Sequence, residues 1–347
     1  MWGSDNMKAL DHKCPGCGAV LKFNPKGQNW VCEYCDSSFV LDELNKHKGK
    51  NDYVSKGKKP SDAYNCKNCG AVLVADSHTS ATHCVYCGNV ALIKEKLTGK
   101  FAPKKVLPFH ITREDVINTF LKLQKGKILM PRLFNIKENI EKITGVYVPF
   151  WLYDVNVSGK VTLSGNRVTT SRTGDYLFTK TDIYNLYRNA NLDYSNITLD
   201  ASSRFDDDYM HSIEPFNYDD LKDYNHSYLS GFLAEIYDKS AEERYRDAES
   251  LVKTTSESII KSKELGYSSV SIKDNNLIIK KNSESYCLLP VWMVNVKYNG
   301  KQYLFAVNGQ TGKIIGNIPI DKKRLFVVSI LVFLITSLLT LLVAVII

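Results

Sequence analysis

The sequence lacks the local motifs that identify nucleotide-dependent and hydrolytic enzymes. Its 347 residues contain no G-x-x-x-x-G-K-[ST], no G-x-G-x-x-G after a strand, no H-E-x-x-H and no G-x-S-x-G. The missing Walker A motif argues against helicase activity. We therefore expect a protein that is not an enzyme. The weakest of the hypotheses considered below is an enzyme whose active site lies in the centre of the chain. A ligand-sized pocket with convergent polar groups would support it.

Two further absences concern export and nucleic-acid binding. The first ten residues contain no apolar segment of the kind found in secretory signals, and the chain has no low-complexity tract. Residues 1–108 contain 16 lysines and no arginine. Because arginine is the residue that most often grips guanine edges, its absence weakens sequence-specific DNA binding by this region. The composition, 44% hydrophobic and 24% charged, is otherwise that of a globular protein with two or three domains.

Eight of the nine cysteines form four Cys-x-x-Cys pairs within the first 87 residues. Disulfide frameworks belong to small secreted domains, so these pairs indicate metal ligands in a chain without an export signal. They make two units of the form C-x2-C-x14-C-x2-C, offset by 52 residues, and the text Cys-Gly-Ala-Val-Leu occurs in both. The chain therefore contains an internal duplication. The expected metal ligands are Cys14, Cys17, Cys32 and Cys35 in the first unit, and Cys66, Cys69, Cys84 and Cys87 in the second.

Four thiolates match the tetrahedral coordination that Zn²⁺ prefers, so each unit predicts a zinc ribbon with one structural Zn²⁺. A hairpin is expected between the knuckles, from Ala19–Phe23 with Gln28–Val31 and, in the copy, from Ala71–Val74 with Thr79–His83. A thioredoxin-like motif would need a single pair beside a βαβ pattern. A catalytic zinc would keep an open position and use His or carboxylate ligands.

The C-terminal run Leu325–Ile347 has 23 residues and no charge. A helix of that length spans ~34 Å, which exceeds the ~30 Å hydrocarbon core of a bilayer. Core helices are rarely apolar on every face, so a transmembrane helix is predicted. The basic residues at 322–324 precede it, and the positive-inside rule places them in the cytoplasm. We expect a single-pass protein of the cell membrane, with its N-terminal bulk cytoplasmic and its C-terminus at the outer face.

The middle of the chain has patterns of both helices and strands. Helices are predicted from Thr112 to Gly126, from Asn135 to Gly145 and from Ser240 to Gly266. Strands are predicted between Val146 and about Phe205 and at Val270–Ile272, Leu277–Ile279, Leu288–Val296, Gln302–Val307 and Lys313–Ile318. The expected fold class is α+β with a largely antiparallel sheet.

Several polar residues and one cysteine have more than one interpretation. The acidic clusters at Asp206–Asp208 and Asp219–Asp220 are cation ligands or, more commonly, solvated loops. His12 and His83 are expected at the surface, and Cys287 is expected to be a buried small hydrophobe. The lysines between 45 and 59 have three interpretations: they contact the phosphates of a nucleic acid, they contact an anionic inner leaflet, or they are simply solvated.

The expected domains follow from these patterns. They are zinc ribbon 1 at 10–44, a flexible Lys-rich linker at 45–61, zinc ribbon 2 at 62–96, an α+β domain at 106–320 and a transmembrane helix at 325–347.

Five motifs carry a resemblance to a known family. They are the tandem Cys-x-x-Cys-Gly knuckles, Gly145-Val-Tyr-Val-Pro-Phe-Trp151, Tyr228-Leu-Ser-Gly-Phe232, Leu289-Pro-Val-Trp292 and Val307-Asn-Gly-Gln-Thr-Gly312. Together they resemble the bacterial membrane-anchored proteins with transcription-factor-IIB-type zinc ribbons, over most of the chain. The resemblance implies a membrane platform that works with a sister membrane protein and recruits a cytoplasmic SPFH-type protein and PspA-like envelope-stress machinery.

The leading hypothesis is therefore a non-enzymatic, membrane-anchored zinc-ribbon adaptor that recruits cytoplasmic proteins. The alternative is a membrane-tethered nucleic-acid-binding protein associated with replication or transcription, whose affinity would fall steeply with salt. The formal net charge of +8 would favour nucleic-acid binding, but this value counts the cysteines as neutral. Eight thiolates and two Zn²⁺ together contribute four negative charges, which leaves a net charge of about +4.

Overall fold

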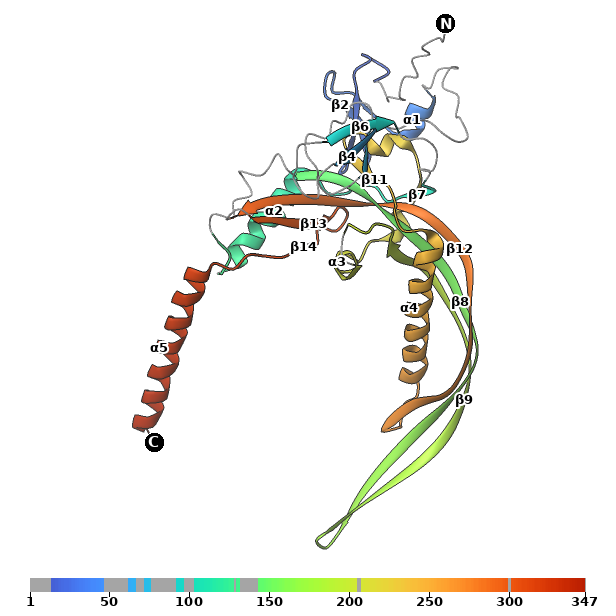
Figure 1. Cartoon of the computed structure of the whole chain (residues 1–347), viewed down its shortest axis with the longest axis vertical. Coiled ribbons are helices and arrows are strands. Elements are labelled where there is room, and N and C mark those ends of the chain that lie inside the picture. The colour runs from blue at the N-terminus through green and yellow to red at the C-terminus, as the bar shows by residue number, and fades with distance from the viewer. Residues whose placement is uncertain are drawn as a thin grey trace.

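The computed structural model describes residues 14–46, 62–66, 72–75, 92–96, 103–127, 129–131, 143–204, 207–298 and 301–346. Over these ranges the protein is α+β with a mostly antiparallel sheet, which confirms the expected fold class at that level (Figure 1). The helix expected from Asn135 to Gly145 lies outside the described residues as far as position 142, and its expected end is wrong because Ile143–Gly145 begin a strand instead. His12, His83 and most of the linker at 45–61 also lie outside them.

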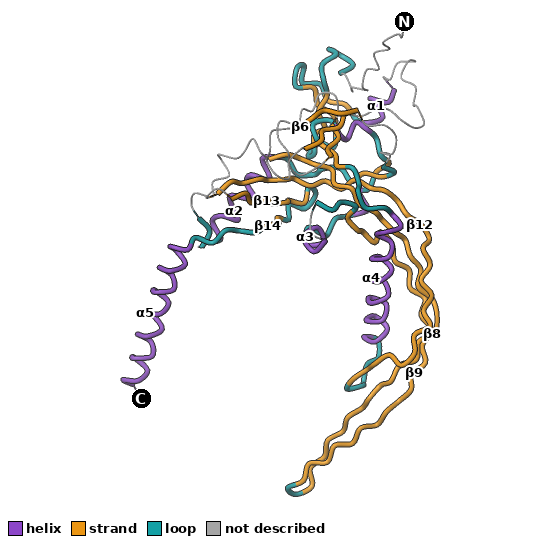
Figure 2. Tube along the Cα trace, in the orientation of Figure 1, coloured by secondary structure: helices purple, strands orange, loops and turns teal. Residues whose placement is uncertain are grey.

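Three long strands dominate the molecule: β8 (Ile143–Thr173), β9 (Tyr176–Asp200) and β12 (Ser269–Tyr298). β8 lies in the middle and pairs antiparallel with both of its neighbours. The three strands curve together, and α4 (Ala241–Ser262) lies along their concave side (Figures 1 and 2). Buried Ala248 of α4 belongs to the same apolar cluster as residues of β8.

The strands are longer than the sequence pattern predicted. The runs expected as Val270–Ile272, Leu277–Ile279 and Leu288–Val296 are all parts of the single strand β12. Polar residues separate these runs, but register shifts at Ile272/Asp274 and Lys281/Ser283 let the ladder with β8 continue past them. The structure therefore corrects three short strands to one long, irregular strand.

Shorter strands complete the main sheet: β4 (Asp62–Cys66), β5 (Val72–Ala75), β6 (Leu92–Lys96), β7 (Lys105–Val106), β10 (Lys222–Asp223), β11 (Leu233–Glu235), β13 (Lys301–Asn308) and β14 (Ile314–Gly316). Their order is β10-β7-β12-β8-β11-β5-β4-β6, with β9 beside β8 and the β13–β14 hairpin beside β12. A separate small sheet contains β1 (Leu21–Asn24), β2 (Asn29–Cys32) and β3 (Ser38–Phe39).

The remaining helices are α1 (Leu41–Lys46), α2 (Arg113–Gly126), α3 (Asp207–Ser212) and α5 (Lys322–Ile346), with 3-10 turns at Tyr218–Asp220 and His226–Leu229. Two predicted helix starts are confirmed. The Ser240 hydroxyl accepts the Glu243 N–H at 3.2 Å before α4. Before α2, the Asp115 carboxylate accepts the Thr112 N–H at 2.9 Å, which forms a capping box.

α5 is long and apolar enough to cross a membrane. Its segment Lys322–Leu341 has a mean hydropathy of 2.4, and none of it is buried against the rest of the chain. Figure 1 shows α5 leaving the body of the protein as a separate element. Its first turn is attached, because the Arg324 guanidinium donates to the Met130 carbonyl at 3.0 Å. These properties agree with the predicted span in length and composition.

Candidate metal centre

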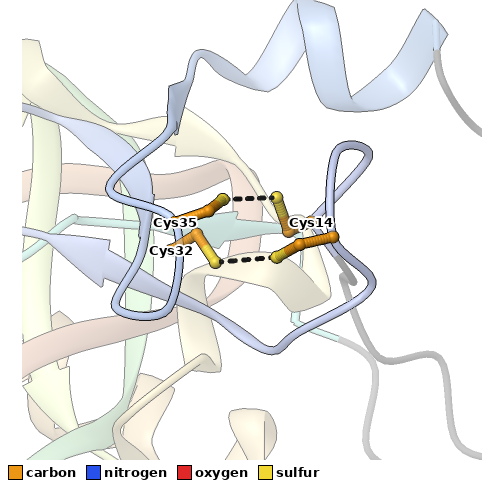
Figure 3. Close-up of side chains that lie close together, drawn as sticks. Cys14, Cys32 and Cys35 are labelled. Atoms are coloured by element: carbon orange, nitrogen blue, oxygen red, sulfur yellow. Dashed lines mark hydrogen bonds between the residues drawn. The ribbon is translucent and has the colours of Figure 1, made fainter.

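Four cysteines from two turns gather around one point (Figure 3). Cys14 and Cys17 come from the turn before β1, and Cys32 and Cys35 from the end of β2 and the turn after it. Their four sulfur atoms all lie within 4.8 Å of one another, so the cluster could hold one metal ion. All four are free cysteines, with Sγ–Sγ distances of 3.6 Å for Cys14–Cys35 and 3.4 Å for Cys17–Cys32. A tetrahedron with Zn–S bonds of ~2.3 Å has edges of ~3.8 Å, whereas a disulfide has ~2.0 Å between its sulfurs.

The same backbone geometry builds both turns. The Gly18 N–H donates to the Cys14 carbonyl at 2.9 Å, and the Asp36 N–H donates to the Cys32 carbonyl at 2.9 Å. Gly18 has φ +75°, and its counterpart Asp36 has φ +57°. A glycine takes this left-handed backbone at no steric cost, and aspartate is among the few other residues that tolerate it. This backbone explains the glycine of the repeated text Cys-Gly-Ala-Val-Leu, whereas no feature of the sequence marked Asp36.

Each turn supplies one buried and one exposed thiol. Cys14 and Cys32 are buried, whereas Cys17 and Cys35 lie at the surface. The hydroxyl and backbone N–H of Ser37 hydrogen-bond to Cys35 and lower the pKa of its thiol to about 6. Because the thiolate is the form that binds metal, Ser37 prepares Cys35 as a ligand at neutral pH.

The second cysteine unit lies mostly outside the described residues. Cys66 ends β4, but its side chain is not described, and Cys69, Cys84 and Cys87 are outside the described ranges. The strand expected at Ala71–Val74 is present as β5. It pairs with β4 on one side and with β11 on the other, so it continues the main sheet. The second ribbon and its Zn²⁺ remain predictions.

The first cysteine unit is docked on the rest of the protein through aromatic side chains. The Trp30 indole N–H donates to the Ser227 carbonyl at 3.0 Å, and the Phe23 N–H donates to the Ser230 carbonyl at 3.3 Å. The rings of Phe23, Trp30 and Tyr228 lie 5.1–5.4 Å apart by their centroids. Buried aromatic pairs at these distances contribute about 0.5–1.5 kcal/mol each beyond their area.

Polar contacts add to this attachment. The Gln28 amide donates to the Phe109 carbonyl at 2.8 Å, and the Lys26 ammonium lies 2.9 Å from the Asp115 carboxylate of α2. The Thr112 N–H and then Lys26 hold the pKa of Asp115 below its usual range. The first cysteine unit therefore packs against the body of the protein with both apolar and charged contacts.

A second aromatic layer lies beneath the docked unit. Phe109 stacks on Phe232 with a centroid distance of 4.2 Å and an interplanar angle of 8°. Edge-on contacts join Phe109 to Tyr147 at 5.0 Å and to Trp292 at 5.2 Å. Gly145 leaves room for this stack, since a Cβ there would lie 2.4 Å from the Phe232 ring. The chain segments that carried the family resemblance thus meet in one cluster.

The sequence could not reveal this convergence. The motifs around Tyr147, Phe232 and Trp292 are separated by 60 or more residues, and nothing local to any of them shows that they touch. The only advance signal was their unusual density of aromatic residues and glycine.

Among the remaining sequence candidates, the pair Asp219–Asp220 has hydrogen-bond partners. Asp220 accepts from the Gln310 amide at 2.9 Å, and Asp219 donates its N–H to Asn217, so this acidic pair closes a loop. The side chains of Asp206–Asp208 are not described. Cys287 is buried as expected, and burial raises the pKa of its thiol.

One buried polar cluster was not predicted. At the end of β9, the Asp200 carboxylate lies 3.0 Å from the Arg244 guanidinium, and both side chains are buried. Nearby, the Glu235 carboxylate accepts the Ser202 hydroxyl at 2.7 Å. These residues join α4 to the end of β9, and no sequence motif marks them.

The comparison with known proteins now identifies the family. The chain is 37% identical over 315 residues to the uncharacterized protein YdjG of Bacillus subtilis (strain 168), which covers 91% of this chain and 92% of that protein. This chain belongs to the YdjG family. No family model matches it. No solved structure matches it either. The YdjG match extends over most of the chain.

Proposed function

We propose that this member of the YdjG family is a non-enzymatic, membrane-anchored adaptor whose first zinc ribbon presents a binding surface to cytoplasmic proteins. The observation that carries the proposal is the way in which the first cysteine unit packs against the body of the protein. Its inner side is fixed on the 3-10 turn His226–Leu229 through Trp30, while its outer side presents Cys17, Cys35 and the aromatic ring of Tyr34 to solvent. A rigid mount with an exposed aromatic residue is typical of a protein-binding surface.

Tyr34 is the residue that most favours a partner. It lies between the two ligands of the second knuckle, and 82% of it is exposed. A large exposed aromatic side chain on a rigid turn loses little entropy when a partner covers it, which is why tyrosine is enriched at interfaces. We propose that the Zn²⁺ is structural and holds this turn in place.

The charges of the ribbon favour a protein partner over nucleic acid. Lys22 pairs with Glu33 at 2.6 Å, and Lys26 pairs with Asp115 at 2.9 Å. These two lysines are therefore already neutralised within the chain. Nucleic-acid binding needs free basic side chains that neutralise phosphates and thereby release the counterions bound to the nucleic acid. The two intrachain pairs reduce the number of such side chains on the ribbon.

The proposed setting is the inner face of the cell membrane, with α5 as a single span and a second Zn²⁺ in the repeated cysteine unit. The resemblance to membrane-anchored proteins with zinc ribbons favours an SPFH-type protein, a sister membrane protein and a PspA-like protein as partners. The SPFH-type and PspA-like partners would connect the protein to envelope-stress machinery.

Affinity capture with the full chain in detergent tests the proposal. We expect Tyr34→Ala to reduce capture of the SPFH-type or PspA-type partner at least tenfold without loss of zinc, because the hot-spot contact is removed and the ligands remain. Tyr187→Ala is the matched control, since Tyr187 is similarly exposed but lies on β9. Unchanged capture by Tyr34→Ala and by Cys32→Ser would refute the adaptor hypothesis for this ribbon. Salt-sensitive retention on DNA or RNA would favour the alternative.

A further inference from the structure

We infer that the outer edge of β9 between Tyr176 and Leu186 is a self-association surface that pairs antiparallel with the same segment of a second copy of this chain. The inference goes beyond the adaptor function. It rests on none of the residues of the metal centre.

The segment lies in a part of the sheet with only two strands. β12 pairs with β8 as far as Asn166, opposite Ser269, and beyond that point β8 and β9 continue alone to the turn between Thr173 and Tyr176. Figures 1 and 2 show this hairpin projecting past α4 and past the end of β12. A two-stranded hairpin is marginally stable in water, whereas three or more strands form a stable sheet. The projecting hairpin would gain from a third strand.

The outer edge of β9 lacks the usual protection against such pairing. Within the described part of the chain, β9 pairs only with β8 along its 25 residues. It contains no proline and no glycine, and its ladder with β8 has no register shift between Tyr176 and Tyr194. Natural edge strands are normally blunted by proline, bulges or repeated charge. The unprotected edge is therefore a template for another strand.

Bulky apolar side chains make up much of the exposed surface of this segment, beside the polar run Thr179–Asp182. Tyr176 is 74% exposed, Leu177 69%, Phe178 55% and Ile183 67%. Because successive residues of a strand point to opposite faces, these side chains lie on both faces of the hairpin. A helix packed on one face would therefore leave the other face exposed. A partner strand beside β9 would shield residues on both faces at once.

The register follows from the backbone. The two-residue turn at Gly174–Asp175 pairs Thr173 with Tyr176, and in such a hairpin the closing pair directs its N–H and C=O groups toward each other. Residues of β9 that lie an odd number of positions after Tyr176 then direct their backbone N–H and C=O groups away from β8, toward the open edge. Thr181 is one of these, so a two-fold axis beside it would let the two copies exchange hydrogen bonds.

This register makes the segment complementary to itself. Lys180 and Asp182 pair with each other within the chain at 3.1 Å. With Thr181 opposite its own copy, Lys180 also lies opposite Asp182 of the second copy, so the two intrachain pairs would join into one network of four alternating charges. Phe178 then lies opposite Tyr184. Opposite charges and aromatic pairs directly across two strands are favourable, and the product is a four-stranded sheet. A lipid surface would contact only the tip and would leave the outward N–H groups without partners, so the second copy is the favoured occupant.

Cross-linking tests the register with the full chain in detergent. Cα atoms of an outward-bonded antiparallel pair lie ~5.5 Å apart, within the range that a disulfide bridges. We expect Thr181→Cys to give an oxidised covalent dimer well above the background of the parent chain. Asn189→Cys is the matched control, because Asn189 lies on the same edge but eight residues away and would not face its own copy. Equal cross-linking of the two variants, or none of Thr181→Cys, would overturn the register.

Charge exchange tests the association itself. Lys180→Asp and Asp182→Lys each place like charges across the proposed pair, and we expect each to weaken dimerisation about tenfold in sedimentation or light scattering. The double exchange restores opposite charges and should restore the dimer. Circular dichroism and zinc content should match the parent in all three variants. A monomeric parent chain, or a dimer that none of the single variants weakens, would overturn the inference.

Discussion

Each cysteine of the metal centre holds its ligand atom in a different environment. Cys32 is buried against the aromatic cluster, so its replacement removes a ligand and also leaves a polar hydroxyl among apolar side chains. We expect Cys32→Ser to lose the metal of the first unit and to lower stability. Metal analysis by mass spectrometry and thermal unfolding measure the two effects.

The control for this variant is Cys287→Ala, which removes a thiol that is equally buried but lies far from the cluster. It should keep the full metal content. If Cys32→Ser also kept its metal, the four-sulfur site would not be the binding site.

The buried pair of Asp200 and Arg244 gives a second prediction at this scale. Arg244→Leu leaves the Asp200 carboxylate buried without its closest cation, at 3.0 Å in the structure. Breaking a buried ion pair from one side costs about 3–5 kcal/mol. Denaturant unfolding should show that loss, whereas Lys281→Leu, which removes a surface pair with Glu284, should cost less than about 1 kcal/mol. Equal effects would show that burial of the pair is unimportant.

The ribbon is an element whose position depends on a few contacts. Trp30→Ala removes the indole N–H bond to Ser227 and the ring contacts with Phe23 and Tyr228. Large-to-small replacement of a core tryptophan costs about 3–5 kcal/mol. We expect the first cysteine unit to detach before the sheet unfolds, so limited proteolysis should cut between the ribbon and α2 sooner than in the parent chain. A cleavage rate equal to that of the parent would contradict the docking.

α5 is the element that we expect to hold the protein in a membrane. A chain that ends at Asp321 lacks the whole helix but keeps the sheet, because α5 is attached through Arg324 to Met130, outside the sheet, and its span is not buried against the rest of the chain. We expect the full chain to resist alkaline extraction from membranes and the truncated chain to be released. A Leu331→Ala variant, which preserves the apolar run, should remain in the membrane. Release of the full chain would contradict the predicted span.

Across the whole molecule, the core of the ribbon is continuous with that of the sheet. Cys14, Trp30 and Phe109 belong to one buried cluster that extends to Trp292. Removal of the proposed Zn²⁺ by a chelator should therefore lower the main unfolding temperature by several degrees, because each loss of about 1 kcal/mol of stability corresponds to ~2–4 °C in a domain of this size. Calorimetry with and without chelator measures the shift. A separate low-temperature transition with an unmoved main peak would mean that the ribbon unfolds independently.

The sequence by itself determined the features that depend on local chemistry. Cysteine spacing identified the four cysteines that gather in the first unit, hydroxyl and acidic residues marked the starts of α2 and α4, and an uncharged run marked α5. These features are local because a knuckle, a helix cap and an apolar helix each depend on residues only a few positions apart.

Only the tertiary structure decided which distant segments meet. It joined the predicted runs from Val270 to Val296 into β12, placed Trp30 on Ser227 and brought Phe109 onto Phe232. It also left the outer edge of β9 open. Such outcomes depend on long-range pairing and on side-chain packing across the fold, and a one-dimensional pattern carries neither.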